Sequence, residues 1–136
     1  MEPVGVDVVF LTSSGSEAES LSGLLAPASV RVHAASSLVE AEGLMAATQA
    51  RVLVAETSFR DGTWQDALQA VARGAPDAVL VVCGADADDR LWAEAINCGA
   101  FDVLVKPFHG PEVCRILTSA FAYAERRPTR PLAAAS

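Results

Sequence analysis

Side chains that could do chemistry stand at the ends of the apolar segments of this sequence. The hydroxyls of Thr12 and Ser13 follow residues 4–11, the Glu56 carboxyl follows 51–55, the Cys83 thiol and Gly84 follow 78–82, and the Lys106 amine follows 103–105. Open α/β sheets place their reactive groups at the carboxyl ends of the strands. A lysine there could pair with a carboxylate or lower the pKa of a thiol. A lysine that leaves a buried strand could also simply reach water.

The apolar segments themselves are typical of buried strands. Four of them, residues 4–11, 51–55, 78–82 and 103–105, are nearly continuous apolar runs, as expected for a parallel sheet covered on both faces. Residues 29–34 alternate apolar and polar side chains, which predicts a half-exposed strand in which His33 is solvated.

Helix signals separate the strands. Serine or threonine before a glutamate or an apolar face predicts a helix start, glycine predicts a helix end, and proline suits the first turn. In chain order the signals are Ser14 with Glu17, Ser37 with Glu40, Thr63, the acidic residues 86–89, Gly99 and Pro111. Residues 60–62 (Arg-Asp-Gly) predict a turn in the loop after the third strand.

Five predicted strands alternate with five predicted helices, and the connections are short and lack hairpin signals. We therefore predict an α/β fold: a three-layer, doubly wound, flavodoxin-like (βα)5 domain with a parallel sheet in the order 2-1-3-4-5. In this order the first, third and fourth strands are adjacent. Their carboxyl ends share one crevice, with Lys106 beside it.

Composition limits the class of protein. The chain has 136 residues and a net charge of −7, which predicts one domain and argues against nucleic acid or an anionic membrane as a direct partner. We expect the domain to cover residues 1–125, with 126–136 as a tail or the start of a linker. The segment 1–3 lacks a basic signal-peptide start, and Cys83, Cys98 and Cys114 are predicted to be reduced and buried, which favours a cytoplasmic location.

A longer motif carries a family resemblance. Residues 95–108, Ala-Ile-Asn-Cys-Gly-Ala-Phe-Asp-Val-Leu-Val-Lys-Pro-Phe, resemble the end of the fourth helix, the fifth strand and the Lys-Pro-Phe signature of response-regulator receiver domains. The resemblance extends over residues 4–125. It implies two-component, phosphorelay signal transduction, in which a phosphoryl group passes from a partner histidine to an aspartate of the receiver. That transfer needs an acidic pair for Mg²⁺, the aspartate, a hydroxyl on the fourth strand and the lysine.

The sequence departs from this pattern at most of the family's working positions. Thr12 and Ser13 replace the acidic pair, Glu56 replaces the aspartate, Cys83 or Gly84 replaces the hydroxyl, and Val103 replaces the switch aromatic. Lys106 is retained. The resemblance therefore implies a pseudo-receiver that is not an enzyme, with no catalytic residue, no metal site and no cofactor.

Three functions follow as hypotheses. The first is a signalling module that acts by protein–protein interaction through the fourth helix, fifth strand and fifth helix, with an output domain, a partner or a second copy, and with Trp92, Val103 and Phe108 as candidate contacts. A permanent Glu56–Lys106 pair would hold it in one state. The second is an active receiver that uses Glu56 or Asp61 as acceptor, and the third is a redox sensor based on Cys83.

Overall fold

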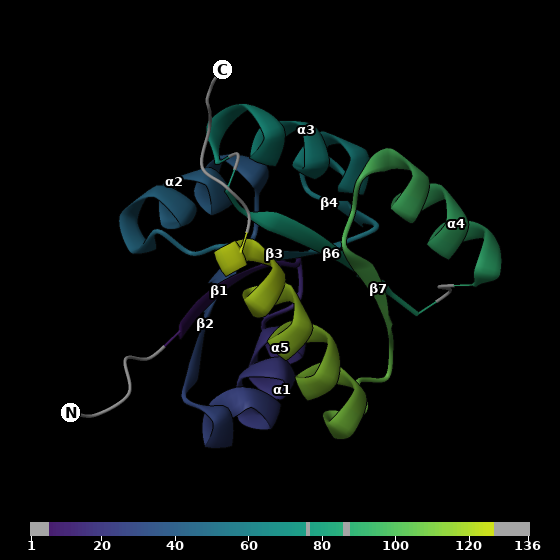
Figure 1. Ribbon diagram of the computed structural model, residues 1–136. Helices are drawn as coiled ribbons and strands as arrows, with labels where there is room; N and C mark the ends of the chain where they lie inside the picture. Colours follow the sequence, from purple (N-terminus) through teal and green to yellow (C-terminus); the bar gives the residue numbers. More distant parts are fainter. Residues whose placement is uncertain (1–5, 76, 86–87, 127–136) are drawn as a thin grey trace.

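A parallel sheet with helices on both faces forms the domain (Figure 1). The computed structural model describes residues 6–75, 77–85 and 88–126. The strands of the main sheet are β1 (Val6–Leu11), β2 (Val30–Ala35), β3 (Val52–Glu56), β6 (Val79–Gly84) and β7 (Asp102–Val105). They are parallel and lie in the order β2-β1-β3-β6-β7, which confirms the predicted order 2-1-3-4-5.

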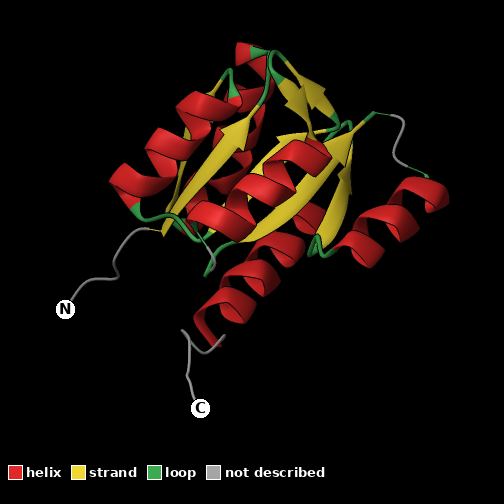
Figure 2. Ribbon diagram, turned by 90° about the horizontal axis from the view of Figure 1, so that it is seen from above, coloured by secondary structure: helices red, strands yellow, loops and turns green. Residues whose placement is uncertain are grey.

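The helices are α1 (Gly15–Leu25), α2 (Leu38–Thr48), α3 (Trp64–Gly74), α4 (Asp89–Cys98) and α5 (Gly110–Arg126), with a short 3-10 turn at Ala26–Ala28. Helices α1 and α5 cover one face of the sheet, and α2, α3 and α4 cover the other (Figures 1 and 2). Alternate residues of β1 supply the two cores: Val8 and Phe10 face α1 and α5, and Val9 and Leu11 face the other layer. The carboxyl ends of all five strands consequently meet at one edge of the molecule.

Side chains cap the helices close to where the sequence predicts. Ser37 Oγ accepts a hydrogen bond from the N–H of Glu40 at 3.1 Å. The Glu40 carboxylate accepts from the N–H of Ser36 at 2.9 Å, one residue before the position that a regular capping box uses. At α3, the Asp66 carboxylate accepts from the N–H of Thr63 at 2.9 Å. Local capping therefore sets the start of both helices.

The loop after β3 differs from the prediction. Sequence reasoning found no hairpin, but β4 (Ser58–Phe59) and β5 (Gly62–Thr63) pair antiparallel around the predicted turn. The hairpin presents Asp61, whose Oδ1 accepts a hydrogen bond from the N–H of Leu38 at 2.8 Å. Asp61 therefore satisfies a free donor in the first turn of α2 from a distant part of the chain.

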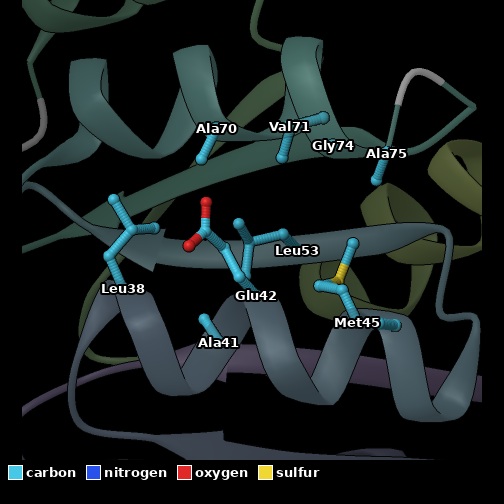
Figure 3. A pocket seen from close by; sticks show the side chains of 10 residues that line it. Leu38, Ala41, Glu42, Met45, Leu53, Ala70, Val71, Gly74 and Ala75 are labelled. Carbon is cyan, nitrogen blue, oxygen red and sulfur yellow. The ribbon is translucent and has the colours of Figure 1, made fainter.

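Helix α2 does not separate its apolar and polar residues into two clear faces. Only Ala41 and Met45 are buried along it, and Val39 is 73% exposed. Between α2 and α3 lies a groove, which we call the α2–α3 groove (Figure 3). Its lining residues are Leu38, Ala41, Glu42, Met45, Ala46, Leu53, Ala70, Val71, Gly74 and Ala75.

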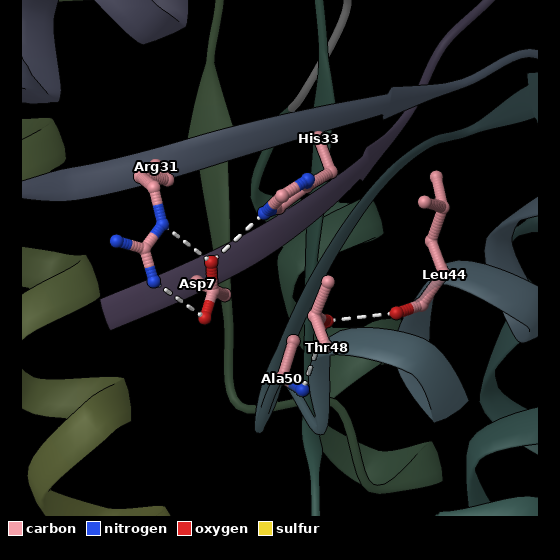
Figure 4. Close-up of polar contacts among 6 residues, drawn as sticks. All are labelled: Asp7, Arg31, His33, Leu44, Thr48 and Ala50. Atoms are coloured by element: carbon pink, nitrogen blue, oxygen red, sulfur yellow. Dashed lines mark hydrogen bonds and ion pairs between the residues drawn. The ribbon is translucent and has the colours of Figure 1, made fainter. Parts of the chain in front are cut away.

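The prediction that His33 is solvated is confirmed only in part, because its side chain is 29% exposed and also contacts a carboxylate. His33 Nε2 lies 2.8 Å from Asp7 Oδ1, and Arg31 donates to both carboxylate oxygens of Asp7 (Figure 4). The hydrogen bonds from Arg31 and His33 hold the pKa of Asp7 below its ordinary value. Asp7 stands opposite Arg31 in the parallel register of β1 and β2, so strand pairing brings together groups that are far apart in the sequence.

Helix α4 is more exposed than its apolar residues predict. Gly99 ends it at a φ of 113°, as expected for a glycine helix end. Cys98 is exposed, so the prediction that every cysteine is buried is wrong. Trp92, a candidate interaction contact, is 50% exposed, and its Nε1 donates to Asp102 Oδ1 at 3.2 Å. Ala95 is the one fully packed residue on the described α4.

Some predictions fall outside the described residues. These are the first two residues of the segment 4–11, residues 86 and 87 of the acidic segment 86–89, and the tail 127–136. Asp88, the described part of the acidic segment, caps α4 by accepting from the N–H of Leu91 at 2.9 Å. Helix α5 continues to Arg126, the first residue of the predicted tail.

Candidate functional site

Four polar side chains meet at the carboxyl ends of β1, β3 and β7. They are Thr12, Glu17, Glu56 and Lys106, and we call them the strand-end cluster. Lys106 Nζ lies 2.8 Å from Glu56 Oε2, and Thr12 Oγ1 donates to the same oxygen at 2.5 Å. The sequence-predicted Glu56–Lys106 contact is therefore present. Both side chains are mostly buried, at 18% exposure for Glu56 and 15% for Lys106, so the pair is partly shielded from solvent.

Thr12 links the cluster to the turn that follows β1. Its side chain is buried, and its Oγ1 accepts a hydrogen bond from the N–H of Ser14 at 3.0 Å while donating to Glu56. Ser13, its neighbour, is exposed. The two residues at the acidic-pair positions thus differ: Thr12 is buried and hydrogen-bonded to Glu56, whereas Ser13 is exposed.

Glu17 joins the cluster, which the sequence did not predict. Its Oε2 lies 3.6 Å from Lys106 Nζ. The capping-box pattern assigned the Glu17 side chain to the N–H of Ser14, but Thr12 accepts that hydrogen instead. The backbone half of the cap is confirmed, since Ser14 Oγ accepts from the N–H of Glu17 at 3.3 Å. One feature of the sequence could have predicted this contact. The Thr12 hydroxyl lies two residues before Ser14 and can accept the hydrogen bond from the Ser14 N–H, which leaves the Glu17 carboxylate available for Lys106.

The electrostatics of Lys106 reflect these neighbours. Burial acts to lower the pKa of its amine, but the hydrogen bond and the charge of Glu56 raise it above the ordinary value. Lys106 is therefore held in its charged form. The Lys106–Pro107 peptide bond is cis.

Cys83 lies next to the cluster in the sheet. It stands opposite Glu56 in the register of β3 and β6, and it is fully buried. Burial raises the pKa of its thiol to about 12, although the charge of Lys106 acts in the opposite direction. The expectation that Lys106 lowers this pKa overall is wrong, because desolvation of a buried thiolate outweighs one nearby cation.

Gly84, the other candidate for the strand-four hydroxyl position, packs closely. A Cβ atom at this position would lie 3.2 Å from Cγ2 of Thr57. Neither Cys83 nor Gly84 presents a hydroxyl to the crevice.

Val103, at the switch-aromatic position, is buried in the core layer of α2, α3 and α4. Asp61, the other candidate acceptor, is held at the start of α2.

The oxygen atoms of the strand-end cluster do not form a suitable set of ligands for Mg²⁺. That ion takes hard oxygen ligands, and one or two carboxylates normally supply its protein contacts. Here one oxygen of Glu56 is occupied by Lys106 and Thr12, and Glu17 also faces the amine. Within residues 6–75, 77–85 and 88–126, no group of three or more histidine, cysteine, aspartate or glutamate side chains could hold a metal. Over the same residues, no helix has the length and apolar character to cross a membrane.

Comparison with solved structures identifies the architecture. No family model and no curated protein matches the sequence. The beryllofluoride-activated NtrC4 receiver domain dimer superposes with a TM-score of 0.79 at 24% identity, covering 87% of this chain and 98% of that one. The chain has the receiver-domain fold.

Two further receiver domains support this assignment. The signal receiver domain of an HD domain-containing protein from Pseudomonas fluorescens Pf-5 gives a TM-score of 0.80 at 21% identity, over 91% of this chain and all of that one, 100%. The chemotaxis response regulator CheY4 of Vibrio cholerae superposes with a TM-score of 0.75 at 19% identity, covering 86% of this chain and 99% of that one. At such identities the similarity concerns the fold, so the site must be interpreted from its own residues.

Proposed function

We propose that this chain is a receiver-type signalling domain that acts by protein–protein interaction and accepts no phosphoryl group. The observation that carries the proposal is the bond of 2.8 Å between Lys106 Nζ and Glu56 Oε2. The lysine that a receiver uses to contact an incoming phosphoryl group is already paired. The longer glutamate side chain reaches the amine in the way that a phosphorylated aspartate would, so the pair holds one state permanently.

The charge of the cluster supports this proposal. Phosphoryl transfer depends on neutralising the charge of the transferred group and on positioning the acceptor in line. Thr12 and Ser13 supply no charge to bind a divalent ion, and Glu56 is fixed by two hydrogen-bond donors. The alternative acceptors and the redox function have no observation in their favour, because Asp61 caps α2 and Cys83 is buried with a raised pKa.

The proposed interaction surface lies on α4, β7 and α5. Among the three expected contacts, Trp92 is exposed, whereas Val103 is buried and Phe108 packs edge-on against Phe10 with ring centroids 6.0 Å apart. Val105, which is 41% exposed, is a better candidate contact than Val103 or Phe108. Trp92 and Val105 border a hollow of about 240 Å³ whose charged residues are Asp88, Asp89, Asp102, Glu112 and Arg115. Acidic groups dominate this hollow, so its chemistry favours a basic partner or output domain over a second copy.

Incubation with radiolabelled acetyl phosphate and Mg²⁺ tests the proposal. The wild-type chain should carry no stable label, and Mg²⁺ at millimolar concentration should give no saturable change in tryptophan fluorescence. A variant with Thr12→Asp, Ser13→Asp and Glu56→Asp, which restores the acidic pair and the acceptor, serves as the positive control. Stable label on the wild type that disappears in Glu56→Ala would overturn the proposal.

A further inference from the structure

The α2–α3 groove is built like a docking site and lies apart from both the strand-end cluster and the proposed surface on α4, β7 and α5. Small side chains at Ala41 and Ala70 keep the two helices from filling the space between them (Figure 3). Leu53 of β3 forms the floor and is almost fully buried, at 2% exposure. Large apolar side chains, Leu38 and Met45, border the opening.

A single charge is placed against this apolar lining. The carboxylate of Glu42 points from α2 into the groove toward α3 (Figure 3). The Glu42 side chain is exposed, and over the described residues it makes no hydrogen bond and no ion pair. By contrast, Glu40 on the same helix is occupied with Ser36. An unpaired carboxylate beside an apolar groove favours an occupant that brings both an apolar group and a positive charge.

The outer surface of α2 continues the groove. Val39, Glu42 and Ala46 follow one another at helical spacing and therefore share a face of α2. Val39 is 73% exposed, the largest exposure among the exposed large hydrophobic residues of the described chain.

The size of the groove selects the kind of occupant. Its volume is about 250 Å³. Pockets for drug-sized molecules measure roughly 300–1,000 Å³, so this one suits one or two side chains of a protein segment. Helices α2 and α3 have 11 residues each, which gives a groove roughly 16 Å long, the length of three helical turns. No strand edge borders it among the described elements, so addition of a β-strand is excluded there.

A second copy of the chain is a poor fit. Helix α2 contains no lysine or arginine, and its charged residues are Glu40 and Glu42. Packing this face against itself would bring like charges together. We propose that the α2–α3 groove binds an amphipathic helix of a partner protein, which inserts one large apolar side chain between α2 and α3 and places a lysine or arginine against Glu42.

Selection from a phage-displayed library of random helix-forming peptides tests this proposal on the full chain. Enriched peptides should carry a large apolar residue with lysine or arginine one helical turn away. A synthetic peptide of the enriched sequence should shift the amide NMR signals of Ala41, Met45, Ala70 and Val71. Its affinity should fall about tenfold or more when Glu42→Lys reverses the charge, and also when Ala46→Phe fills the groove from an exposed position.

Matched controls separate this site from other effects. Glu19→Lys makes the same charge change on α1, where the side chain is exposed on the opposite layer, and should leave binding unchanged. Trp92→Ala alters the surface of the proposed function and should also leave binding unchanged. Far-UV circular dichroism confirms the fold of each variant.

Four outcomes would overturn the proposal. They are the absence of enriched peptides, equal binding to the Glu42→Lys variant, equal binding of a peptide whose basic residue is changed to glutamine, and a wild-type dimer in sedimentation that Ala46→Phe dissociates. The last would assign the groove to a second copy. None of these outcomes bears on whether the strand-end cluster accepts a phosphoryl group.

Discussion

In the strand-end cluster, one oxygen of Glu56 receives hydrogen bonds from both Lys106 and Thr12, whereas in the α2–α3 groove Glu42 faces apolar side chains and has no partner among the described residues. Both carboxylates lie beside core strands of the same domain, Glu56 mostly buried and Glu42 exposed. They differ in which groups the fold has placed around them: the ends of β1 and β7 supply donors to Glu56, and two helices supply only apolar side chains to Glu42.

This difference indicates which of the two regions is better suited to bind another molecule. In the cluster, a new ligand would have to displace contacts that the protein makes with itself, at a cost in stability. In the groove, a ligand would gain contacts that the free protein lacks. At the carboxyl ends of the strands, Lys106 and Glu56 are thus already paired with each other. In the α2–α3 groove, the carboxylate of Glu42 has no partner among the described residues.

The largest expected effect is a difference in alkylation rate between Cys83, which lies beside the strand-end cluster, and Cys98. Cys83 beside Glu56 is buried with its pKa raised to about 12, whereas Cys98 is exposed. In the native protein at pH 8, iodoacetamide should alkylate Cys98 faster than Cys83 by a factor on the order of a thousand or more, because the reactive thiolate of Cys83 is scarce. Timed alkylation followed by peptide mass spectrometry measures the ratio. Equal rates in the folded chain would mean that the cluster is open to solvent.

The next effect is on stability. Replacing Lys106 by methionine leaves Glu56 and Glu17 facing each other without a cation, and should lower the free energy of unfolding by about 2–3 kcal/mol. Urea denaturation at pH 7 measures this loss.

The same pair makes a prediction about pH. Burial acts to lower the pKa of Lys106, but Glu56 raises it above the ordinary lysine value of 10.5. The stabilisation is therefore fully present below pH 10.5 and is lost as the pH rises through the raised value. The difference in stability between wild type and Lys106→Met should shrink over that alkaline range. A difference that stays constant there would contradict the assigned role of the pair.

A smaller effect is expected at Asp61, which positions one wall of the groove. Replacing Asp61 by alanine removes the acceptor for the N–H of Leu38 and should cost about 1 kcal/mol, the usual value of a helix cap. Hydrogen exchange should increase in the first turn of α2, and Arg60→Ala in the same turn serves as the control. A loss of stability with unchanged exchange in α2 would place the role of Asp61 elsewhere.

The smallest effect is expected in the groove itself. Replacing Glu42 by glutamine should change the free energy of unfolding by no more than about 0.5 kcal/mol, because no contact within the described chain is lost. Glu56→Gln, the same chemical change in the cluster, should destabilise the protein more. Thermal unfolding of the two variants side by side makes the comparison, and equal losses would remove the distinction between the two regions.

The sheet was predictable because its signal is local. Continuous apolar runs identify buried parallel strands, and short connections leave few possible orders, so the boundaries agree with the structure to within two residues wherever they are described. The helix caps at Ser14 and Ser37 were predictable for the same reason, since both partners lie within three residues. The contact of Glu56 with Lys106 required one further step, the placement of strand ends at a common edge.

What escaped prediction depends on partners distant in the chain. His33 contacts Asp7 because β1 and β2 pair in a particular register. Glu17 turns to Lys106 because Thr12 takes its expected partner. Trp92 and Cys98 have the spacing of packed residues, but α4 buries little beyond Ala95. Helical periodicity shows which residues share a face and does not show how much of that face is covered.

The hydrogen bond between Glu56 and Lys106 also has a consequence for timing. A phosphoryl group on a carboxylate is hydrolysed in water, so a domain that carries one returns to rest at a rate set by that hydrolysis. Two side chains of one chain form a contact that nothing consumes. Under the proposed function, the signal passed on by this domain therefore has no built-in duration, and it persists for as long as the binding partner is present.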